Sequence, residues 1–320
     1  MRIALAIRPL IDEKLVLSRQ IGVTDIVTCY PGPGFEALEK VHSYIESFGL
    51  RLTVIENDVP MDDIIHGGPN RDAQIEAVAD MLQSMGKLEI PVWCYCWMPG
   101  GDWSRTSVDV SDRGGSLVSQ FDIAQVDSAK VLDVNGEADH AWNVGKEPTT
   151  QSQLWENLEY FLRQILPVAE SAGVVLAMHP DDPPMSPFLG DAQIMTCPDE
   201  LQRLLELVPS PANAITFCQG VFSSMGVDVV ENIYRFRDHI GFVHFRDVVG
   251  SVPKFTETWH DSGQTDMAAC IRAYDEIGFD GPIRPDHVPV LAGESTDLAG
   301  YTMLGRLWAI GYMKGLMDAR

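Results

Sequence analysis

Short apolar runs alternate with longer amphipathic stretches along almost the whole chain. Eight of these runs are typical of β-strands buried on both faces, because they are nearly continuous in apolar and β-branched residues. They cover residues 2–7, 25–29, 51–57, 91–98, 174–179, 214–220, 241–248 and 281–287. The segments between them repeat apolar residues at intervals of three and four, which predicts helices.

Eight strands that alternate with helices predict an α/β protein whose parallel sheet closes into a (β/α)8 TIM barrel. Such a barrel accommodates 320 residues as one domain, so we expect a single domain over residues 1–320. Residues 99–150 interrupt the alternation after the fourth strand, with a polar sequence rich in Gly, Asp and Ser. Because this insertion follows a strand, we expect a loop that covers the C-terminal, active-site face of the barrel.

The charge of the chain narrows the classes of partner. With 46 acidic and 23 basic residues the formal net charge is −23, which argues against nucleic acid and anionic membrane surfaces as partners. No segment approaches the roughly 18 apolar residues of a transmembrane helix, and the first ten residues do not resemble a signal peptide. The six cysteines show no disulfide-framework spacing. We therefore expect a cytoplasmic protein.

Four strand-like runs end in a side chain that can bind a metal. These are His179 in VVLAMHPDDPP, Cys218 in AITFCQG, His244 in GFVHFRDV and Asp286 in GPIRPDH. In a (β/α)8 barrel the strand ends converge on one face, and the mixture of imidazole, thiolate and carboxylate suits a borderline divalent ion. The four residues are spread over about 110 positions, unlike the local cysteine pairs of structural zinc sites. This spacing favours a catalytic ion with open coordination positions.

Other polar side chains close to these strand ends have more than one interpretation. Arg246 shares a face with His244 by strand alternation, and it would bind a substrate carboxylate or form a surface ion pair. His287 would act as a general acid or base, or would hydrogen-bond around the metal ligands. His260, in a loop before a helix, would close over the site and contact substrate.

Two aspartates follow the first of the candidate ligands directly. Asp181 and Asp182 come after His179, but one ligand from each strand end already supplies the protein's share of the coordination sphere. We expect these aspartates to shape the loop or to orient His179 from outside the coordination sphere.

The chain resembles the mannonate dehydratases, which are metal-dependent enzymes of the xylose-isomerase-like barrel group. The resemblance runs from about residue 68 to the C-terminus. It is carried by VWCYCWMPGGDWSRT (92–106), MHPDDPP (178–184), TFCQG (216–220), VHFRDV (243–248), GFDGPIRPDH (278–287) and GYTMLGRLWAIGYMKGL (300–316).

This resemblance implies a Mn²⁺-dependent lyase that removes water from D-mannonate to give 2-keto-3-deoxy-D-gluconate, with Fe²⁺, Co²⁺ or Mg²⁺ as other candidate ions. The implied metal ligands are His179, Cys218, His244 and Asp286. His287 and Tyr301 would be the acid–base groups beside Asp286, and Arg246 and Arg105 would contact the sugar acid.

Several positions depart from the family pattern and leave the sugar acid open. Val288 and Pro289 stand where the family usually has Gly-Arg, and Cys96 stands where it usually has Asn. A sugar isomerase or epimerase on the same barrel is one alternative, and a non-catalytic metal- or carbohydrate-binding relative is another. The apolar segment 304–316 would close the barrel or bury a subunit contact. The resemblance suggests a homo-oligomer, either a dimer or a tetramer.

Overall fold

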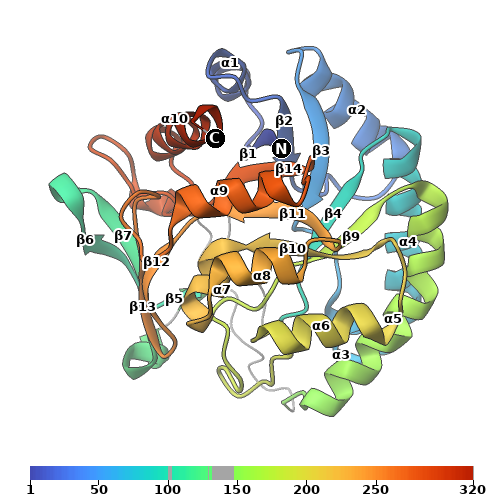
Figure 1. Cartoon of the computed structure of the whole chain (residues 1–320). Coiled ribbons are helices and arrows are strands. Elements are labelled where there is room, and N and C mark those ends of the chain that lie inside the picture. The colour runs from blue at the N-terminus through green and yellow to red at the C-terminus, as the bar shows by residue number, and fades with distance from the viewer. Residues whose placement is uncertain (100–102, 129, 132–147, 320) are drawn as a thin grey trace.

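Eight parallel strands close into a barrel at the centre of the molecule (Figure 1). The computed structural model describes residues 1–99, 103–128, 130–131 and 148–319. Within these residues the barrel strands are β1 (Arg2–Ala6), β2 (Asp25–Thr28), β3 (Arg51–Glu56), β4 (Val92–Tyr95), β9 (Val175–Met178), β10 (Asn213–Cys218), β11 (Ile240–Phe245) and β14 (Pro282–Pro285). Six of the eight strands lie inside their predicted runs, β10 and β11 each begin one residue before theirs, and the (β/α)8 prediction is confirmed.

The two faces of these strands explain why their sequences are apolar throughout. One face fills the inside of the barrel with mostly small or β-branched side chains, namely Ala4, Val27, Val54, Val92, Cys94, Ala177 and Phe242. The other face packs against the surrounding helices in the main core, where Leu5, Ile26 and Leu176 are at most 2% exposed. A strand covered on both sides has no solvent-facing positions, so the usual polar alternation disappears.

Helices surround the barrel (Figure 1). They are α1 (Asp12–Gln20), α2 (Phe35–Glu46), α3 (Asp62–His66), α4 (Arg71–Lys87), α5 (Gln151–Ala172), α6 (Pro198–Leu207), α7 (Gln219–Met225), α8 (Val229–Arg235), α9 (Met267–Glu276) and α10 (Met303–Asp318). Segment 304–316 lies in α10, where Ile310 and Met313 join the main core. Lys314 of α10 donates to the carbonyl of Ile21 at 3.2 Å, which ties the last helix to the first.

Helix α5 shows how local sequence sets the ends of an element. Thr150 accepts a hydrogen bond from the backbone of Gln153, whose side chain accepts in return from the backbone of Thr150. This capping box satisfies backbone groups that the first turn leaves unpaired. Gly173 ends the helix with a φ of 69°, a conformation that glycine adopts without steric cost.

The described part of the insertion after β4 contains strands. It forms β5 (Ser104–Arg105), β6 (Ser107–Ser111), β7 (Leu117–Asp122) and β8 (Lys130–Val131), with short 3₁₀ turns at Arg113–Gly115 and Ile123–Ser128. Strands β6 and β7 join β12 (Val248–Ser251) and β13 (Lys254–Glu257) in an antiparallel sheet, ordered β12-β13-β7-β6. Another 3₁₀ turn, Thr296–Leu298, precedes α10.

The prediction that residues 99–150 cover the C-terminal face falls partly outside the described residues, which omit 100–102, 129 and 132–147. The pairing of β7 with β13 anchors the described part to the loop after β11. The single-domain boundary and the covering role of the whole insertion stay predictions.

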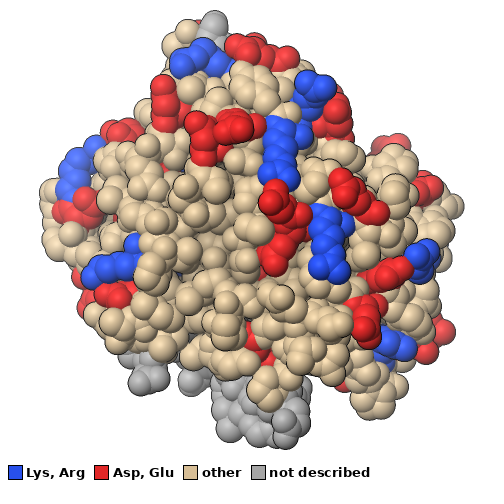
Figure 2. Space-filling view, turned by 60° about the horizontal axis from the view of Figure 1, so that its bottom comes forward, with Lys and Arg blue, Asp and Glu red and all other residues tan. Residues whose placement is uncertain are grey.

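The surface gives little support to a polyanionic partner. On the face shown in Figure 2, the described Lys and Arg side chains are interspersed with Asp and Glu and form no continuous basic surface. None of the helices in the described ranges combines the length and the hydropathy needed to cross a membrane.

Candidate metal centre and active site

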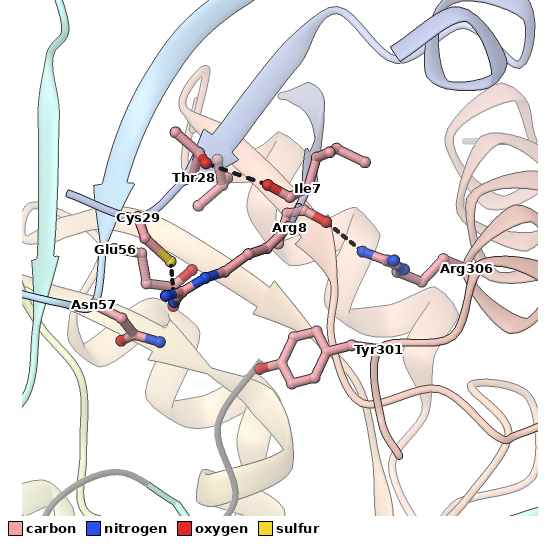
Figure 3. Close-up of a pocket in the computed structure, with 10 residues that line it drawn as sticks. Ile7, Arg8, Thr28, Cys29, Glu56, Asn57, Tyr301 and Arg306 are labelled. Carbon is pink, nitrogen blue, oxygen red and sulfur yellow. Dashed lines mark hydrogen bonds between the residues drawn. The ribbon is translucent and has the colours of Figure 1, made fainter. Parts of the chain in front are cut away.

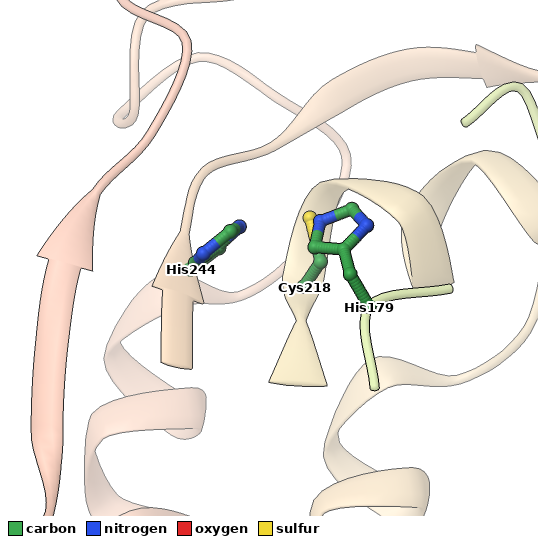
Figure 4. A group of neighbouring side chains, drawn as sticks. All are labelled: His179, Cys218 and His244. Carbon is green, nitrogen blue, oxygen red and sulfur yellow. The ribbon is translucent and has the colours of Figure 1, made fainter. Parts of the chain in front are cut away.

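Three of the predicted metal ligands converge at the C-terminal end of the barrel. His179 follows β9, Cys218 ends β10, and His244 is the neighbour of Cys218 in the β10–β11 register. One ligand atom from each lies within 4.8 Å of the others, and all three residues are buried. Figure 4 shows their side chains directed into a common space from three successive segments of the barrel. This donor set fits a borderline divalent ion.

A backbone carbonyl orients the ring of His179 so that the ring can bind a metal. Its Nδ1 lies 2.6 Å from the carbonyl oxygen of Pro180, and a carbonyl oxygen can only accept. The proton is therefore on Nδ1, and the lone pair of Nε2 is available to a metal. Burial, the largest influence, lowers the pKa of His179 and favours the neutral ring that ligation requires.

His244 is held by a carboxylate that the sequence reasoning missed. Oε1 of Glu56, at the end of β3, lies 3.1 Å from Nε2 of His244. Burial alone would raise the pKa of Glu56, but Arg284 and then His244 hold it well below its usual range. Glu56 occupies a strand end like the other candidates. The same signal, a metal-binding side chain at the end of an apolar run, is thus present at the third strand.

Glu56 and Cys94 also form a second group of candidate ligands with His244, again within 4.8 Å. Glu56 already accepts a hydrogen bond of 3.0 Å from Nη2 of Arg284, and burial raises the pKa of the Cys94 thiol well above its usual value. A bound cation would have to displace Arg284 and deprotonate Cys94. The first group is therefore the better metal site.

Asp286, the fourth predicted ligand, lies beside this group and bonds strongly to arginine. Its Oδ2 is 3.7 Å from Nδ1 of His244 and 3.9 Å from Sγ of Cys218. Its Oδ1 accepts a hydrogen bond of 2.6 Å from Arg284. Burial opposes ionisation, but Arg284 and the neighbouring histidines lower the pKa of Asp286 well below its usual range. The carboxylate is thus ionised and adjacent to the metal ligands.

The two predicted acid–base residues border the same space. Nδ1 of His287 lies 3.0 Å from Oε1 of Glu257, and Oη of Tyr301 lies 3.4 Å from Oδ1 of Asp286. The ring of Trp103 stacks on His287 with 3.9 Å between centroids. Burial, followed by the guanidinium of Arg246, lowers the pKa of His287. His287 is therefore neutral near pH 7 and can accept a proton.

The tautomer of His287 depends on two neighbours of Nδ1. Glu257 can only accept a hydrogen bond from Nδ1, whereas Arg246, whose Nη1 also contacts this atom, can only donate. The bond to Glu257 has an ordinary length, so we place the proton on Nδ1 and the lone pair on Nε2. The backbone of His287 has a φ of 27°, a strained value for a residue with a side chain.

Arg105 and Arg246, predicted to contact substrate, lie in a buried network of ion pairs. Arg105 bonds to both carboxylate oxygens of Asp182 at 2.8 and 2.9 Å and to Glu257 at 2.5 Å. Arg246 bonds to the same two carboxylates at 2.7 and 2.6 Å. Because each guanidinium is already paired, the structure favours an indirect role in which both arginines hold Glu257 against His287.

Asp182 therefore belongs to this network, and a role in orienting His179 stays a prediction. Burial alone would raise the pKa of Asp182, but Arg105 and then Arg246 hold it well below its usual range. Asp181 shapes the loop, because its Oδ2 accepts a hydrogen bond of 2.7 Å from the backbone of Met195. Burial raises the pKa of Asp181 to about 8.

His260 is not one of the three residues that converge as metal ligands. Its ring is fully buried and stacks on Phe245 with 5.9 Å between centroids. Burial lowers the pKa of His260 to about 4, so the ring is neutral. A direct substrate contact by His260 stays a prediction that this geometry does not favour.

A cavity of about 300 Å³ lies above the metal ligands. Its wall is made by residues from five strand ends and two loops: Glu56, Asn57, Cys96, Trp103, His179, Asp182, His244, Arg284, Asp286, His287 and Tyr301. The polar lining suits a small, polar molecule. Glu56, Arg284 and Glu257 are the functional candidates that sequence reasoning missed. Glu257 gave no signal, because it lies on a strand outside the barrel.

Comparison with known proteins agrees with this geometry. The sequence profile of the family described as D-mannonate dehydratase (UxuA) matches residues 12–320. A mannonate dehydratase of Streptococcus equi subsp. zooepidemicus is 36% identical over 292 residues, which are 86% of this chain and 80% of the relative. That of Shouchella clausii is 35% identical over 309 residues, which are 89% and 85% of the two chains.

Solved structures show the same relationship. The crystal structure of mannonate dehydratase from Streptococcus suis serotype 2 superposes with a TM-score of 0.87 at 32% identity, and the match covers 100% of this chain and 94% of that one. An L-ribulose 3-epimerase superposes with a TM-score of 0.63 at 14% identity, covering 99% and 95%, which shows the fold alone. The chain thus belongs to the D-mannonate dehydratase family.

Proposed function

We propose that this protein is a metal-dependent hydro-lyase that converts D-mannonate to 2-keto-3-deoxy-D-gluconate and water. The observation that carries the proposal is the convergence of His179, Cys218 and His244 beside Asp286, with His287 and Tyr301 on the same cavity. Family membership identifies the chain as a hydro-lyase. The metal and the individual residue roles are our inference from the geometry.

The residues present fit a divalent ion. His179, Cys218, His244 and Asp286 would hold it, and Mn²⁺ suits this mixed donor set, with Fe²⁺, Co²⁺ or Mg²⁺ as other candidates. When bound, the ion would act as a Lewis acid that stabilises the negative charge developing on the substrate carboxylate. Glu56 would fix the ring of His244, as carboxylates commonly do for histidine ligands.

His287 is placed to take the proton from the carbon next to the carboxylate. Glu257 holds Nδ1 at 3.0 Å, which leaves Nε2 as the basic atom of a neutral ring. Trp103 covers one face of the ring and keeps water from it. As the C2–H bond breaks, the proton passes to Nε2, and its electron pair forms the C2–C3 double bond.

Tyr301 is placed to supply the proton that the leaving hydroxyl needs. Its Oη borders the cavity and donates a hydrogen bond of 3.4 Å to Oδ1 of Asp286, and its ring lies edge-on to that of His287 with 5.5 Å between centroids. As the C3–O bond breaks, the phenol protonates the oxygen, and water departs. The resulting enol then tautomerises to the 2-keto-3-deoxy acid, so that atoms and protons balance.

The direct test is product formation. Protein loaded with Mn²⁺ and incubated with D-mannonate should give 2-keto-3-deoxy-D-gluconate, identified by NMR, and chelation should abolish it. The absence of this product with Mn²⁺, Fe²⁺, Co²⁺ and Mg²⁺ alike would contradict the proposal. An isomer or epimer of the sugar, recovered without loss of water, would favour the isomerase or epimerase alternative.

The cellular location, the partner molecule and the oligomeric state of the enzyme are also proposals. We propose a cytoplasmic location, in keeping with six cysteines that show no disulfide-framework spacing. We propose a small sugar acid as the partner molecule and a homo-oligomer, a dimer or a tetramer, as the assembly. Sedimentation measurements on the purified chain would test the assembly.

A further inference from the structure

Asn57 borders the metal cavity but has no part in the reaction proposed above. It follows directly after β3, and it forms the cavity wall next to Glu56. Most other polar side chains of this wall bind the metal in the proposed reaction, orient its ligands or transfer a proton. Asn57 is therefore a wall position of the candidate active site without an assigned role.

The backbone of Asn57 has a conformation that residues with a side chain rarely adopt. Its φ is 68°, and that of the next residue, Asp58, is 62°. The carbonyl of Asn57 accepts a hydrogen bond of 3.3 Å from the backbone of Tyr30, which ties this turn to the segment after β2. Asparagine tolerates the left-handed region better than most residues, but glycine adopts it without strain. A side chain at such a position, in the wall of a site, points to a use for its amide.

Asn57 shares the boundary of the cavity with Tyr301. Together with Glu56, these two residues line both the metal cavity and a second space next to it. In Figure 3 the amide of Asn57 is directed into the space that the hydroxyl group of Tyr301 also enters. In the proposed reaction this hydroxyl group protonates the oxygen on C3 of the substrate. The next carbon, C4, therefore lies in the part of the cavity that Asn57 borders.

A carboxamide is well suited to bind a sugar hydroxyl. It offers N–H donors and a carbonyl acceptor side by side, and a hydroxyl group can use one of each. Glu56 is the neighbouring wall residue, but its ionised carboxylate can only accept, and it already bonds to Arg284 at 3.0 Å. Asn57 is thus a neutral group that can both donate to and accept from a hydroxyl group at this point of the wall.

We propose that Asn57 is a specificity-determining residue whose amide binds the C4 hydroxyl group of the sugar acid. A substrate with the opposite configuration at C4 would direct this hydroxyl group away from the amide and lose both hydrogen bonds, which is the physical basis of the discrimination. The inference rests on the proposed function, because the position of C4 follows from the role of Tyr301 in that reaction.

The experiment compares D-mannonate with D-talonate, its epimer at C4, on the full-length, Mn²⁺-loaded protein. The two acids have the same charge and the same carbon chain, and they share their configuration at C2, C3 and C5. We expect kcat/KM to be about 10- to 100-fold higher for D-mannonate, the effect of two hydrogen bonds between neutral groups. Equal values for the two acids, or a preference for D-talonate, would overturn the proposal.

Substitutions assign the preference to the amide. Asn57→Gly removes the amide but suits the backbone conformation, so it should reduce the preference to less than about threefold by raising KM for D-mannonate, with metal content unchanged. Glu89→Gly is the matched control and should keep the full preference, because Glu89 is exposed after α4 and also has a positive φ, of 55°. Asn57→Asp keeps the shape but lacks the donor and should lose at least about threefold of the preference. It decides the question if Asn57→Gly does not fold.

Equilibrium binding separates this inference from the proposed reaction. If neither acid loses water, calorimetry on the Mn²⁺-loaded protein measures the Kd of each acid instead. Tighter binding of D-mannonate that Asn57→Gly abolishes would then support the role of Asn57, while the missing turnover would contradict the proposed dehydration alone. Dehydration of D-mannonate with a preference that Asn57→Gly leaves unchanged would support the reaction and overturn the role of Asn57. Equal weakening of both acids by Asn57→Gly would also overturn it.

Discussion

The metal cluster and the arginine–carboxylate network lie side by side but are built in different ways. His179, Cys218 and His244 come from consecutive barrel strands, whose ends the topology must bring together. Arg105 and Glu257 of the network come from β5 and β13, outside the barrel and 152 positions apart. The cluster is thus a consequence of the fold, whereas the network depends on how two loops pair above it.

Substitutions in the two regions should also have different effects on metal content and on stability. Loss of a cluster residue should remove the ion and the activity while the core remains, because the barrel strands are held by their own packing. Loss of a network carboxylate should leave the buried arginines with fewer charged partners and reduce the free energy of unfolding. The following substitutions test this contrast, from the largest expected effect to the smallest.

Cys218→Ser should have the largest effect. A hydroxyl is a poor substitute for a thiolate ligand. Loss of a residue that only orients a ligand costs up to ~100-fold in metal affinity, so loss of the ligand itself should cost more. Dehydration should become undetectable, and elemental analysis of the purified variant should show loss of the ion. Cys270→Ser, a buried core cysteine of α9, is the control and should retain its metal. Full metal content in Cys218→Ser would remove this residue from the ligand set.

His287→Asn should reduce kcat by about 10²- to 10⁴-fold, the usual contribution of a general base. Metal content should be unchanged, because His287 is not among the proposed ligands. Steady-state kinetics with D-mannonate and metal analysis of the same sample distinguish the two effects. The exposed His239 provides the control His239→Asn. An unchanged kcat would assign the proton transfer to another group.

Asp182→Asn should destabilise the fold by about 3–5 kcal/mol, because Arg105 would then keep only Glu257 as a charged partner, and Arg246 only Glu257 and Asp286. Urea unfolding gives the difference, with Asp199→Asn, which breaks an exposed ion pair, as the control. A change below about 1 kcal/mol, the value typical of a surface pair, would show that the network does not stabilise the fold.

Glu56→Gln should weaken metal binding by about 10- to 100-fold, since it removes the carboxylate that holds Nε2 of His244. Titration of the metal-free protein measures the change. The exposed Glu159, paired with Arg163 on α5, offers the control Glu159→Gln. Unaltered affinity would mean that His244 needs no orienting partner.

Acid should affect the network through the same carboxylates. Arginine neighbours lower the folded-state pKa values of Asp182 and Glu257. A depressed pKa contributes stability above the unfolded value of about 4, and this contribution is lost as the pH falls further towards the folded value. Unfolding measured between pH 7 and pH 3 should therefore show a steeper loss for the wild type than for Asp182→Asn. Parallel curves would contradict this account.

The parts predicted well are those with strong local signals. Fully apolar runs such as 214–220 identified the barrel strands. The polar composition of 99–150 concealed β6 and β7, because their pairing partner β13 lies far along the chain. Glu257 was missed for the same reason. Arg246 was placed on the correct face, but only its neighbours show that it is already paired.

The sequence by itself determined the barrel, because eight buried strands alternating with helices have one simple closed arrangement, and with it the meeting of His179, Cys218 and His244. Only the tertiary structure decided which charges neutralise one another. Among the described residues, it paired Arg105, Arg246 and Arg284 with carboxylates, whereas Arg306 donates to backbone carbonyls. The physical reason is the separation of the interacting groups along the chain. Hydrophobic periodicity is a property of neighbouring residues, whereas the compensation of a buried charge depends on groups that approach only after folding.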